Sequence, residues 1–127
     1  MADNIQIGLD AEKIKRFANL EQKNTFVTTN FTKNEIKYCF LKTNPAIHLA
    51  GIFCAKEAII KTMAGKIHMR EIEITHAKND KPEVKINCAN KIKDKFKVSI
   101  THTTDIAIAT ALRQKKWKHQ TMRKHPK

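Results

Sequence analysis

Hydrophobic residues recur with two different periods in the first half of the chain. Alternation over residues 4–9 predicts a short strand that ends at Asp10. A helical period predicts a helix over residues 11–23, and a capping-box pattern predicts a second helix over residues 32–42. A longer helix is expected over residues 45–64, because a proline suits its first turn and a glycine follows its last residue.

The period changes to two after that long helix. Residues 69–87 alternate on either side of the turn sequence NDKP, which predicts a β-hairpin. Residues 88–96 indicate a short helix, and residues 97–102 and 105–112 predict two further strands joined by a tight connection. Because most of the strands follow the helices along the chain, we expect an α+β fold.

Charge is distributed unevenly along the 127 residues. The chain has 25 Lys and Arg against 12 Asp and Glu, a net charge of +13. Seven of the basic residues and no acidic residue lie in residues 113–127, so we expect one domain over residues 1–112 and a basic tail after it. A basic surface favours an anionic partner: nucleic acid, an anionic membrane, a phosphate-rich cofactor or an acidic protein.

Apolar runs and cysteines narrow the class of protein. No run of 18 apolar residues predicts a membrane span, and the first residues lack the basic and apolar regions of a secretory signal. Cys39, Cys54 and Cys88 form no CxxC pair, so neither a disulfide framework nor a zinc ribbon is indicated. Reduced thiols in the cytoplasm are therefore expected.

Four polar residues interrupt or end apolar elements. Asp10 ends the first predicted strand, Glu57 and Lys61 share one face of the long helix, and His102 ends a later strand. Two carboxylates that meet from separate elements would favour a cation between them, and Mg²⁺ accepts two such ligands when phosphate oxygens complete its shell. Each residue also has a structural interpretation: a helix cap for Asp10, a surface ion pair for Glu57 and Lys61, and a packed side chain for His102.

The order of the motifs resembles the holo-[acyl-carrier-protein] synthase family of 4′-phosphopantetheinyl transferases. The resemblance runs from Ile5 to about Leu112. It rests on IGLD followed by a basic segment, FTKNEIKYC, LAGIFCAKEAIIK, REIEI, NDKP and VSITHT, which occur in the order of the family. A single one of these motifs would be weak, but six in register are specific.

That resemblance implies a fold, a reaction and an assembly. The implied fold is an antiparallel sheet packed on a long central helix. The implied reaction is Mg²⁺-dependent transfer of 4′-phosphopantetheine from coenzyme A to a serine of an apo acyl carrier protein, which releases adenosine 3′,5′-bisphosphate. The carrier could serve fatty acid biosynthesis or a secondary pathway. Family members of this length are typically homotrimers with active sites between subunits, and the apolar alternation of residues 105–112 suits a strand buried in such an assembly.

Site roles also follow from motif position in the family. Asp10 and Glu57 match the Mg²⁺ ligands, and Glu57, Lys61 and His102 match residues with catalytic roles. The serine proton would pass to Glu57 or to a water held by the metal. Lys13 and Arg16 match the face that docks the acidic carrier protein. The residues that match the coenzyme A contacts are Phe53, Lys61, Lys81, Pro82, His102 and Thr103.

The sequence departs from the family pattern at four places. Ile52 stands where the family has an arginine, so a phosphate or nucleotide contact is missing or supplied elsewhere. Lys13 replaces an acidic residue, and Glu12 beside it would face another way on the predicted helix. The glycine-rich loop after the long helix is reduced to residues 64–65, and Asp80 replaces the glycine of the NDKP turn.

These departures leave an alternative function open. A weakened family member could act as a coenzyme A-binding or nucleic-acid-binding protein, which the basic tail with Trp117 and His119 would suit. Binding to arbitrary DNA or RNA that weakens steeply with salt would distinguish that alternative.

Overall fold

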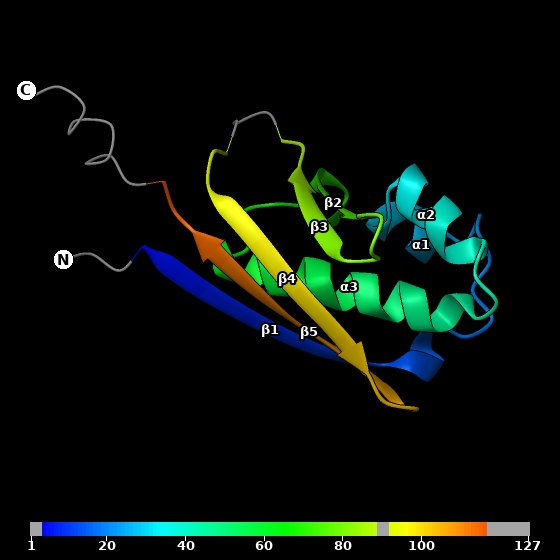
Figure 1. The fold of residues 1–127 in the computed structure, drawn as a ribbon. Helices are drawn as coiled ribbons and strands as arrows, with labels where there is room; N and C mark the ends of the chain where they lie inside the picture. Colours follow the sequence, from blue (N-terminus) through cyan, green and yellow to red (C-terminus); the bar gives the residue numbers. More distant parts are fainter. Residues whose placement is uncertain (1–3, 89–91, 117–127) are drawn as a thin grey trace, which may run out of the picture.

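The computed structural model describes residues 4–88 and 92–116, which form two sheets and several helices (Figure 1). A three-stranded antiparallel sheet has the order β1-β5-β4, and a two-stranded antiparallel sheet pairs β2 with β3. The strands are β1 (Ile5–Lys13), β2 (Ile72–His76), β3 (Pro82–Ile86), β4 (Lys95–His102) and β5 (Ile106–Gln114). The predicted α+β fold, with an antiparallel sheet along a long helix, is confirmed.

The first strand is longer than predicted, and the helix expected over residues 11–23 is wrong. β1 continues through Lys13 because it pairs with β5 along its whole length, from Ile5 opposite Gln114 to Lys13 opposite Ile106. A single 3₁₀ turn, η1 (Ile14–Phe17), follows the strand. Ile14 and Phe17 are buried, so the i, i+3 spacing that suggested a helix arises from this one turn.

The helices that follow agree closely with the sequence. α2 (Lys33–Phe40) begins at the predicted capping box, in which the side chains of Thr32 and Glu35 each accept a hydrogen bond from the backbone N–H of the other residue. α3 (Pro45–Thr62) is the long helix, and Ala64 and Gly65 adopt left-handed backbone conformations just after it. A short helix, α1 (Thr25–Asn30), was not predicted; the Asn24 side chain caps it by accepting a hydrogen bond from the Phe26 backbone.

The second half contains both predicted hairpins. A 3₁₀ turn, η2 (Met69–Glu71), precedes β2, and β2 and β3 form the first hairpin. β4 and β5 form the second, with Thr103 accepting hydrogen bonds at the turn. The short helix predicted over residues 88–96 falls partly on residues 89–91, which lie outside the described residues; residues 95 and 96 belong to β4, so its end is wrong.

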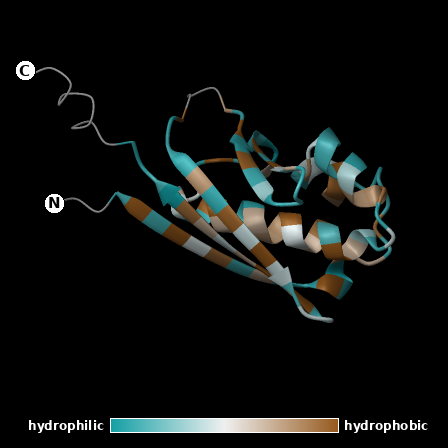
Figure 2. Cartoon of the chain, in the orientation of Figure 1, coloured by the Kyte–Doolittle hydropathy of each residue, from teal (hydrophilic) through white to brown (hydrophobic). Residues whose placement is uncertain are grey.

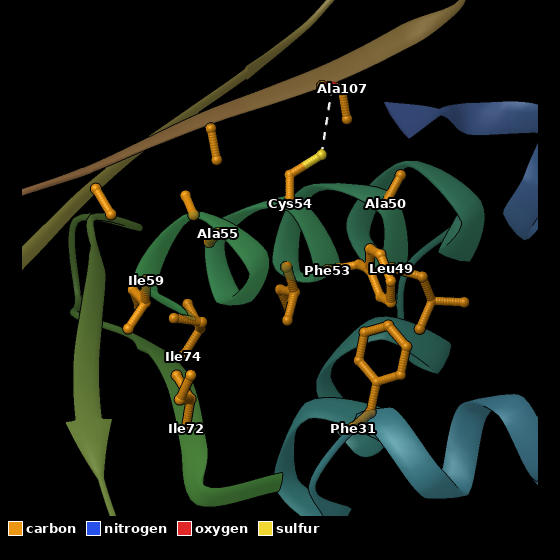
Figure 3. Close-up of a cluster of buried hydrophobic side chains, with 14 of the residues drawn as sticks. Phe31, Leu49, Ala50, Phe53, Cys54, Ala55, Ile59, Ile72, Ile74 and Ala107 are labelled. Carbon is orange, nitrogen blue, oxygen red and sulfur yellow. Dashed lines mark hydrogen bonds between the residues drawn. The ribbon is translucent and has the colours of Figure 1, made fainter. Parts of the chain in front are cut away.

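Small residues bring the large sheet close to α3. Ala107, Ala109 and Ala111 of β5 are buried against the helix, and the Cys54 thiol donates a hydrogen bond to the carbonyl of Ala107 (Figure 3). A Cβ atom on Gly8 would lie 1.9 Å from the carbonyl oxygen of Ala58. The backbone of β1 therefore lies directly on α3, which brings the side chains of this strand to the helix.

A buried ion pair ties α3 to α2 and β2. Lys56 donates hydrogen bonds to Glu35 Oε1 at 2.6 Å and to the backbone oxygen of Asn30 at 2.7 Å. The other oxygen of Glu35 accepts from the Ile74 backbone at 2.7 Å. Both charged side chains are fully buried, so the lysine inside the apolar stretch FCAKEAIIK has a structural partner 21 residues away.

The outer face of β1 and β5 is apolar. Alternate residues of these strands face away from α3, and large hydrophobic side chains among them are exposed, with Ile7 72% and Leu9 59% accessible. Figure 2 shows the resulting alternation of hydrophobic and hydrophilic positions along β1. Within residues 4–88 and 92–116, no helix combines the length and apolar character that crossing a membrane requires.

Candidate functional site

Two carboxylates lie on the face of β1 that is turned toward α3. Asp10 pairs with Ala109 and Glu12 pairs with Ala107, and both alanines are buried against the helix. Residues two apart on a strand share a face, so Asp10 and Glu12 lie side by side. The expectation that Glu12 faces another way is therefore wrong, because it assumed a helix where β1 continues.

Lys61 reaches from α3 to this edge of the sheet. Its Nζ atom donates to the backbone oxygen of Leu9 at 2.7 Å and lies 3.4 Å from Asp10 Oδ1. The lysine side chain is 53% exposed, whereas that of Asp10 is only 13% exposed. Lys61 and Asp10 thus lie close together, and the lysine side chain remains half open to solvent.

The second carboxylate oxygen of Asp10 is buried without a hydrogen-bond partner. The surroundings of this oxygen are acidic: the pKa of Glu12 is raised by its partial burial and by the neighbouring Asp10, against the opposing effect of Arg16. Burial, with Asp10 and Glu12 close by, raises the pKa of the Cys54 thiol to about 12. A buried acceptor with no donor, beside a second carboxylate, is an arrangement that a cation would stabilise.

Glu57 lies on the same side of α3 as the groups that meet Asp10. Cys54 meets β5 at Ala107 and Lys61 meets β1 at Leu9, so both face the large sheet. Glu57 stands three residues after the first and four before the second, so it shares their helical stripe. Its side chain is half-buried. In the part of the chain that the structure describes, no cluster of three or more His, Cys, Asp or Glu side chains could hold a metal. Asp10 and Glu57 could therefore supply only part of a metal shell.

Arg16 is held against an aromatic cluster next to the two carboxylates of β1. Its Nη1 atom donates to Glu12 Oε1 at 2.7 Å, and its guanidinium carbon lies 5.0 Å from the centroid of the Phe53 ring and 5.1 Å from that of Phe26. Phe53 is 5% exposed and contacts the rings of three other phenylalanines. The structure thus places Phe53 in the core beneath Arg16.

His102 lies across the sheet from the carboxylates. Ala107 pairs with Glu12 on one side and with His102 on the other, so two strand spacings, about 10 Å, separate the backbones of Glu12 and His102. His102 lines a pocket of about 190 Å³ together with Pro82 and Ile52. The structure therefore divides the predicted residues into a carboxylate–lysine cluster and a separate pocket.

The two remaining predicted contacts lie at turns. Thr103 closes the β4–β5 turn, where its hydroxyl accepts from the backbones of Asp105 and Ile106. Lys81 is exposed, and its backbone donates to the Asn79 side chain. Asp80 adopts φ of 65° there, so it takes the left-handed conformation that glycine favours.

Comparison with known proteins places the chain in a family. Residues 6–111 match the sequence model of the family ACPS, which is described as the 4′-phosphopantetheinyl transferase superfamily. The chain belongs to this superfamily. The match covers most of the chain, including the carboxylate–lysine cluster and the pocket at His102. The predicted relationship to the holo-[acyl-carrier-protein] synthases is therefore confirmed, and the protein is an enzyme of that family.

Individual relatives of this superfamily cover nearly the same residues. A holo-[acyl-carrier-protein] synthase from Caldicellulosiruptor saccharolyticus is 33% identical over 117 residues, covering 86% of this chain and 95% of the relative. One from Caldanaerobacter subterraneus is 36% identical over 113 residues, covering 82% and 87%. The fold matches the ACPS–CoA complex from Chronobacterium ammoniagenes with a TM-score of 0.77 at 21% identity, over 91% of this chain and 100% of that one.

The sequence did not single out every residue of these clusters. Glu12 was assigned to the wrong face, although its alternation with Asp10 already fitted a strand. His48 and His76 line the pocket with His102, and they come from α3 and β2. No local pattern marks them, since each lies alone in its own segment.

Proposed function

We propose that this transferase moves 4′-phosphopantetheine from coenzyme A to a serine of an acyl carrier protein, with Mg²⁺ as its cofactor. The observation that carries the proposal is the arrangement at the edge of β1: the Asp10 carboxylate, with one buried oxygen lacking a donor, lies beside the half-exposed side chain of Lys61. Holo-[acyl-carrier-protein] synthases are the relatives that share this length, and a protein of the same fold binds coenzyme A.

The residues fit the charge that develops in phosphoryl transfer. Asp10 and Glu57 are the residues that would hold Mg²⁺, which when bound would neutralise the pyrophosphate oxygens of coenzyme A. Lys61 would donate to an oxygen of the transferred phosphate, because half of its side chain is open to solvent. The 2.7 Å hydrogen bond to the Leu9 carbonyl holds its ammonium in place.

The attacking serine must lose a proton. Glu57 is the half-buried carboxylate of α3 on the stripe that faces the large sheet, so it is our candidate for the base. His102 would contact the coenzyme across the sheet rather than the carboxylates of β1, because two strand spacings separate it from Glu12.

The carrier protein would dock beside η1. A hollow of about 450 Å³ there is lined by two lysines, two isoleucines, a threonine and one aspartate: Lys13, Lys15, Ile14, Ile106, Thr104 and Asp105. An acidic amphipathic helix suits such a surface, since its carboxylates would meet the lysines and its apolar residues the isoleucines. Arg16, fixed by Glu12 and the phenylalanines, would present a preset guanidinium to that helix.

Association into a homotrimer is the assembly we propose. The exposed apolar side chains on β1 and β5, among them Ile7, Leu9 and Leu112, form a sheet face that monomeric proteins rarely leave uncovered. The carboxylate–lysine cluster and the histidine-lined pocket of one chain are separate, which agrees with a coenzyme site completed by a neighbouring subunit.

Release of adenosine 3′,5′-bisphosphate from coenzyme A tests this function. With a purified apo carrier and Mg²⁺, we expect release at a rate that falls about 100-fold or more when Lys61 is changed to Ala. The control is Lys66→Ala, an exposed lysine just after α3, which should keep the wild-type rate. Equal rates for both variants would contradict the role of Lys61, and no release by the wild type with any carrier would contradict the function.

The cellular location remains a prediction. None of the three cysteines, all within the described residues, forms a disulfide. Burial raises the pKa of Cys39, as well as that of Cys54, to about 12, so both thiols are protonated and poorly reactive. This agrees with the reduced thiols expected for a cytoplasmic protein.

A further inference from the structure

Three histidines from three elements meet around the small pocket. His48 comes from α3, His76 ends β2 and His102 ends β4. Ile47, Ile52 and Ile100 add apolar walls. The volume of about 190 Å³ is below the roughly 300–1,000 Å³ of sites that enclose whole small molecules, so the pocket fits one end of a ligand.

Tyr38 of α2 fixes two of the imidazoles. The His76 ring stacks on the Tyr38 ring with centroids 4.1 Å apart and planes 2° from parallel. The His48 ring meets Tyr38 edge-on, with centroids 5.9 Å apart. Both rings are half-buried, so they are oriented before any ligand arrives.

One lysine and one aspartate act on these rings. Lys42, two residues after α2, lies with its Nζ atom 4.5 Å from the centroid of the Tyr38 ring. The pKa of His48 is lowered by burial and then by Lys42, His76 and His102, while Asp80 opposes this. The pKa of His76 is lowered by burial, with Asp80 raising it and Lys42 lowering it. Asp80 is therefore the acidic group that acts on both rings, and the lowered pKa values of His48 and His76 favour their neutral forms in the unliganded protein.

We propose that His48 and His76 bind a phosphate group of the nucleotide end of coenzyme A and take up protons when they do so. This inference rests on the proposed function and adds two binding residues to it. The buried wall at Ile52 carries no charge, although the family pattern has an arginine there, and His48 and His76 line the same pocket, where they would supply a positive charge on protonation. A phosphate dianion favours the protonated form of an imidazole beside it.

The direction of the pH dependence follows from this linkage. Because the dianion raises the pKa of each histidine in the complex, affinity is greatest below the pKa of the free histidine, falls as the pH rises from that value to the pKa of the complex, and levels off above it. The affinity should fall by at most about tenfold per pH unit for each proton taken up on binding. The second pKa of a phosphate is about 6, so the ligand itself stays largely dianionic between about pH 6.5 and pH 8.5.

Calorimetric titration of the intact protein with adenosine 3′,5′-bisphosphate tests the inference. We would measure the affinity from about pH 6.5 to pH 8.5, and at the lower pH in two buffers of different ionisation enthalpy, which counts the protons taken up. Wild-type protein should take up protons and bind more weakly as the pH rises. His48→Gln and His76→Gln should each bind about tenfold more weakly at the lower pH, lose part of the proton uptake and flatten the pH profile.

His68→Gln is the matched control. His68 is an exposed histidine ahead of η2 and does not line the pocket, so this variant should keep the wild-type profile. Adenosine 5′-monophosphate serves as a second probe, because loss of the proton uptake with it would assign the histidines to the 3′-phosphate, and retention would assign them to the 5′-phosphate.

The outcomes separate this inference from the proposed function. Binding without proton uptake by the wild type, which needs no variant to fold, would overturn the histidine assignment and leave the transferase proposal standing. The same conclusion follows if His48→Gln and His76→Gln keep the wild-type profile. Failure of the wild type to bind adenosine 3′,5′-bisphosphate at every pH would overturn both.

Discussion

Replacing Lys56 by Met should remove a large part of the folding free energy. The change leaves the Glu35 carboxylate fully buried with backbone donors but without its cation, and it leaves the Asn30 carbonyl without the lysine donor. Breaking a buried pair on one side typically costs about 3–5 kcal/mol. Since a domain of this size is stable by only about 5–15 kcal/mol, the loss should be evident in any unfolding experiment.

The loss of folding free energy in Lys56→Met should come from the unpaired charge rather than from the lost side-chain volume. Met nearly fills the space of the lysine stem, so little of the loss should come from a cavity. Glu35→Gln should also destabilise. It strands the Lys56 ammonium, and its single amide oxygen can accept from only one of the Thr32 and Ile74 backbones, which donate to different oxygens of Glu35. The double variant removes both charges, so its loss should fall short of the sum of the single losses by about 2 kcal/mol.

Urea unfolding followed by far-ultraviolet circular dichroism measures these losses at one fixed protein concentration, since association would shift the midpoint. Lys37→Met, an exposed lysine on α2, is the control and should change stability by less than about 0.5 kcal/mol. A loss below about 1 kcal/mol for Lys56→Met, or strictly additive effects in the double variant, would refute the reasoning.

Three further predictions concern the sheet and the site. Gly8→Ala should cost about 3 kcal/mol or more in thermal unfolding, because its Cβ would meet the Ala58 carbonyl at 1.9 Å, whereas Gly51→Ala meets only a side-chain methyl at 3.0 Å and should cost less. Lys61→Ala should change the free energy of unfolding by less than about 1 kcal/mol, since that lysine is half exposed; a larger loss would mean that its loss of activity reports misfolding. Leu9→Lys should shift sedimentation toward the monomer, and unchanged sedimentation would argue against assembly through this face.

The elements of the fold with local signals could be predicted from the sequence. The capping box at Thr32 and the left-handed stop at Gly65 depend on neighbouring residues alone, so the helices they bound were predicted well. The predicted first strand ended too early, because residues 11–17 fit both the strand period and the helical period. Only the pairing with β5, about a hundred residues later, decides between the two. α1 was missed because its six residues carry little hydrophobic pattern beyond a cap.

The site divides in the same way. Asp10 and Lys61 could be chosen because motif order relates them, and the structure brings them within 3.4 Å. The side-chain direction predicted for Glu12 assumed a helix over residues 11–23, where β1 in fact continues. The error in secondary structure therefore placed Glu12 on the wrong face, away from Asp10. The pocket joins His48, His76 and His102 from three elements, and only tertiary packing brings such isolated histidines together.

Intact-mass spectrometry of an apo acyl carrier protein, incubated with this enzyme, coenzyme A and Mg²⁺, tests the central claim most directly. We predict a gain of one phosphopantetheine per carrier that is abolished by Glu57→Gln and retained by Glu83→Gln, an exposed glutamate on β3. An unchanged carrier mass with several carriers, or an equal gain with the Glu57→Gln variant, would contradict the account.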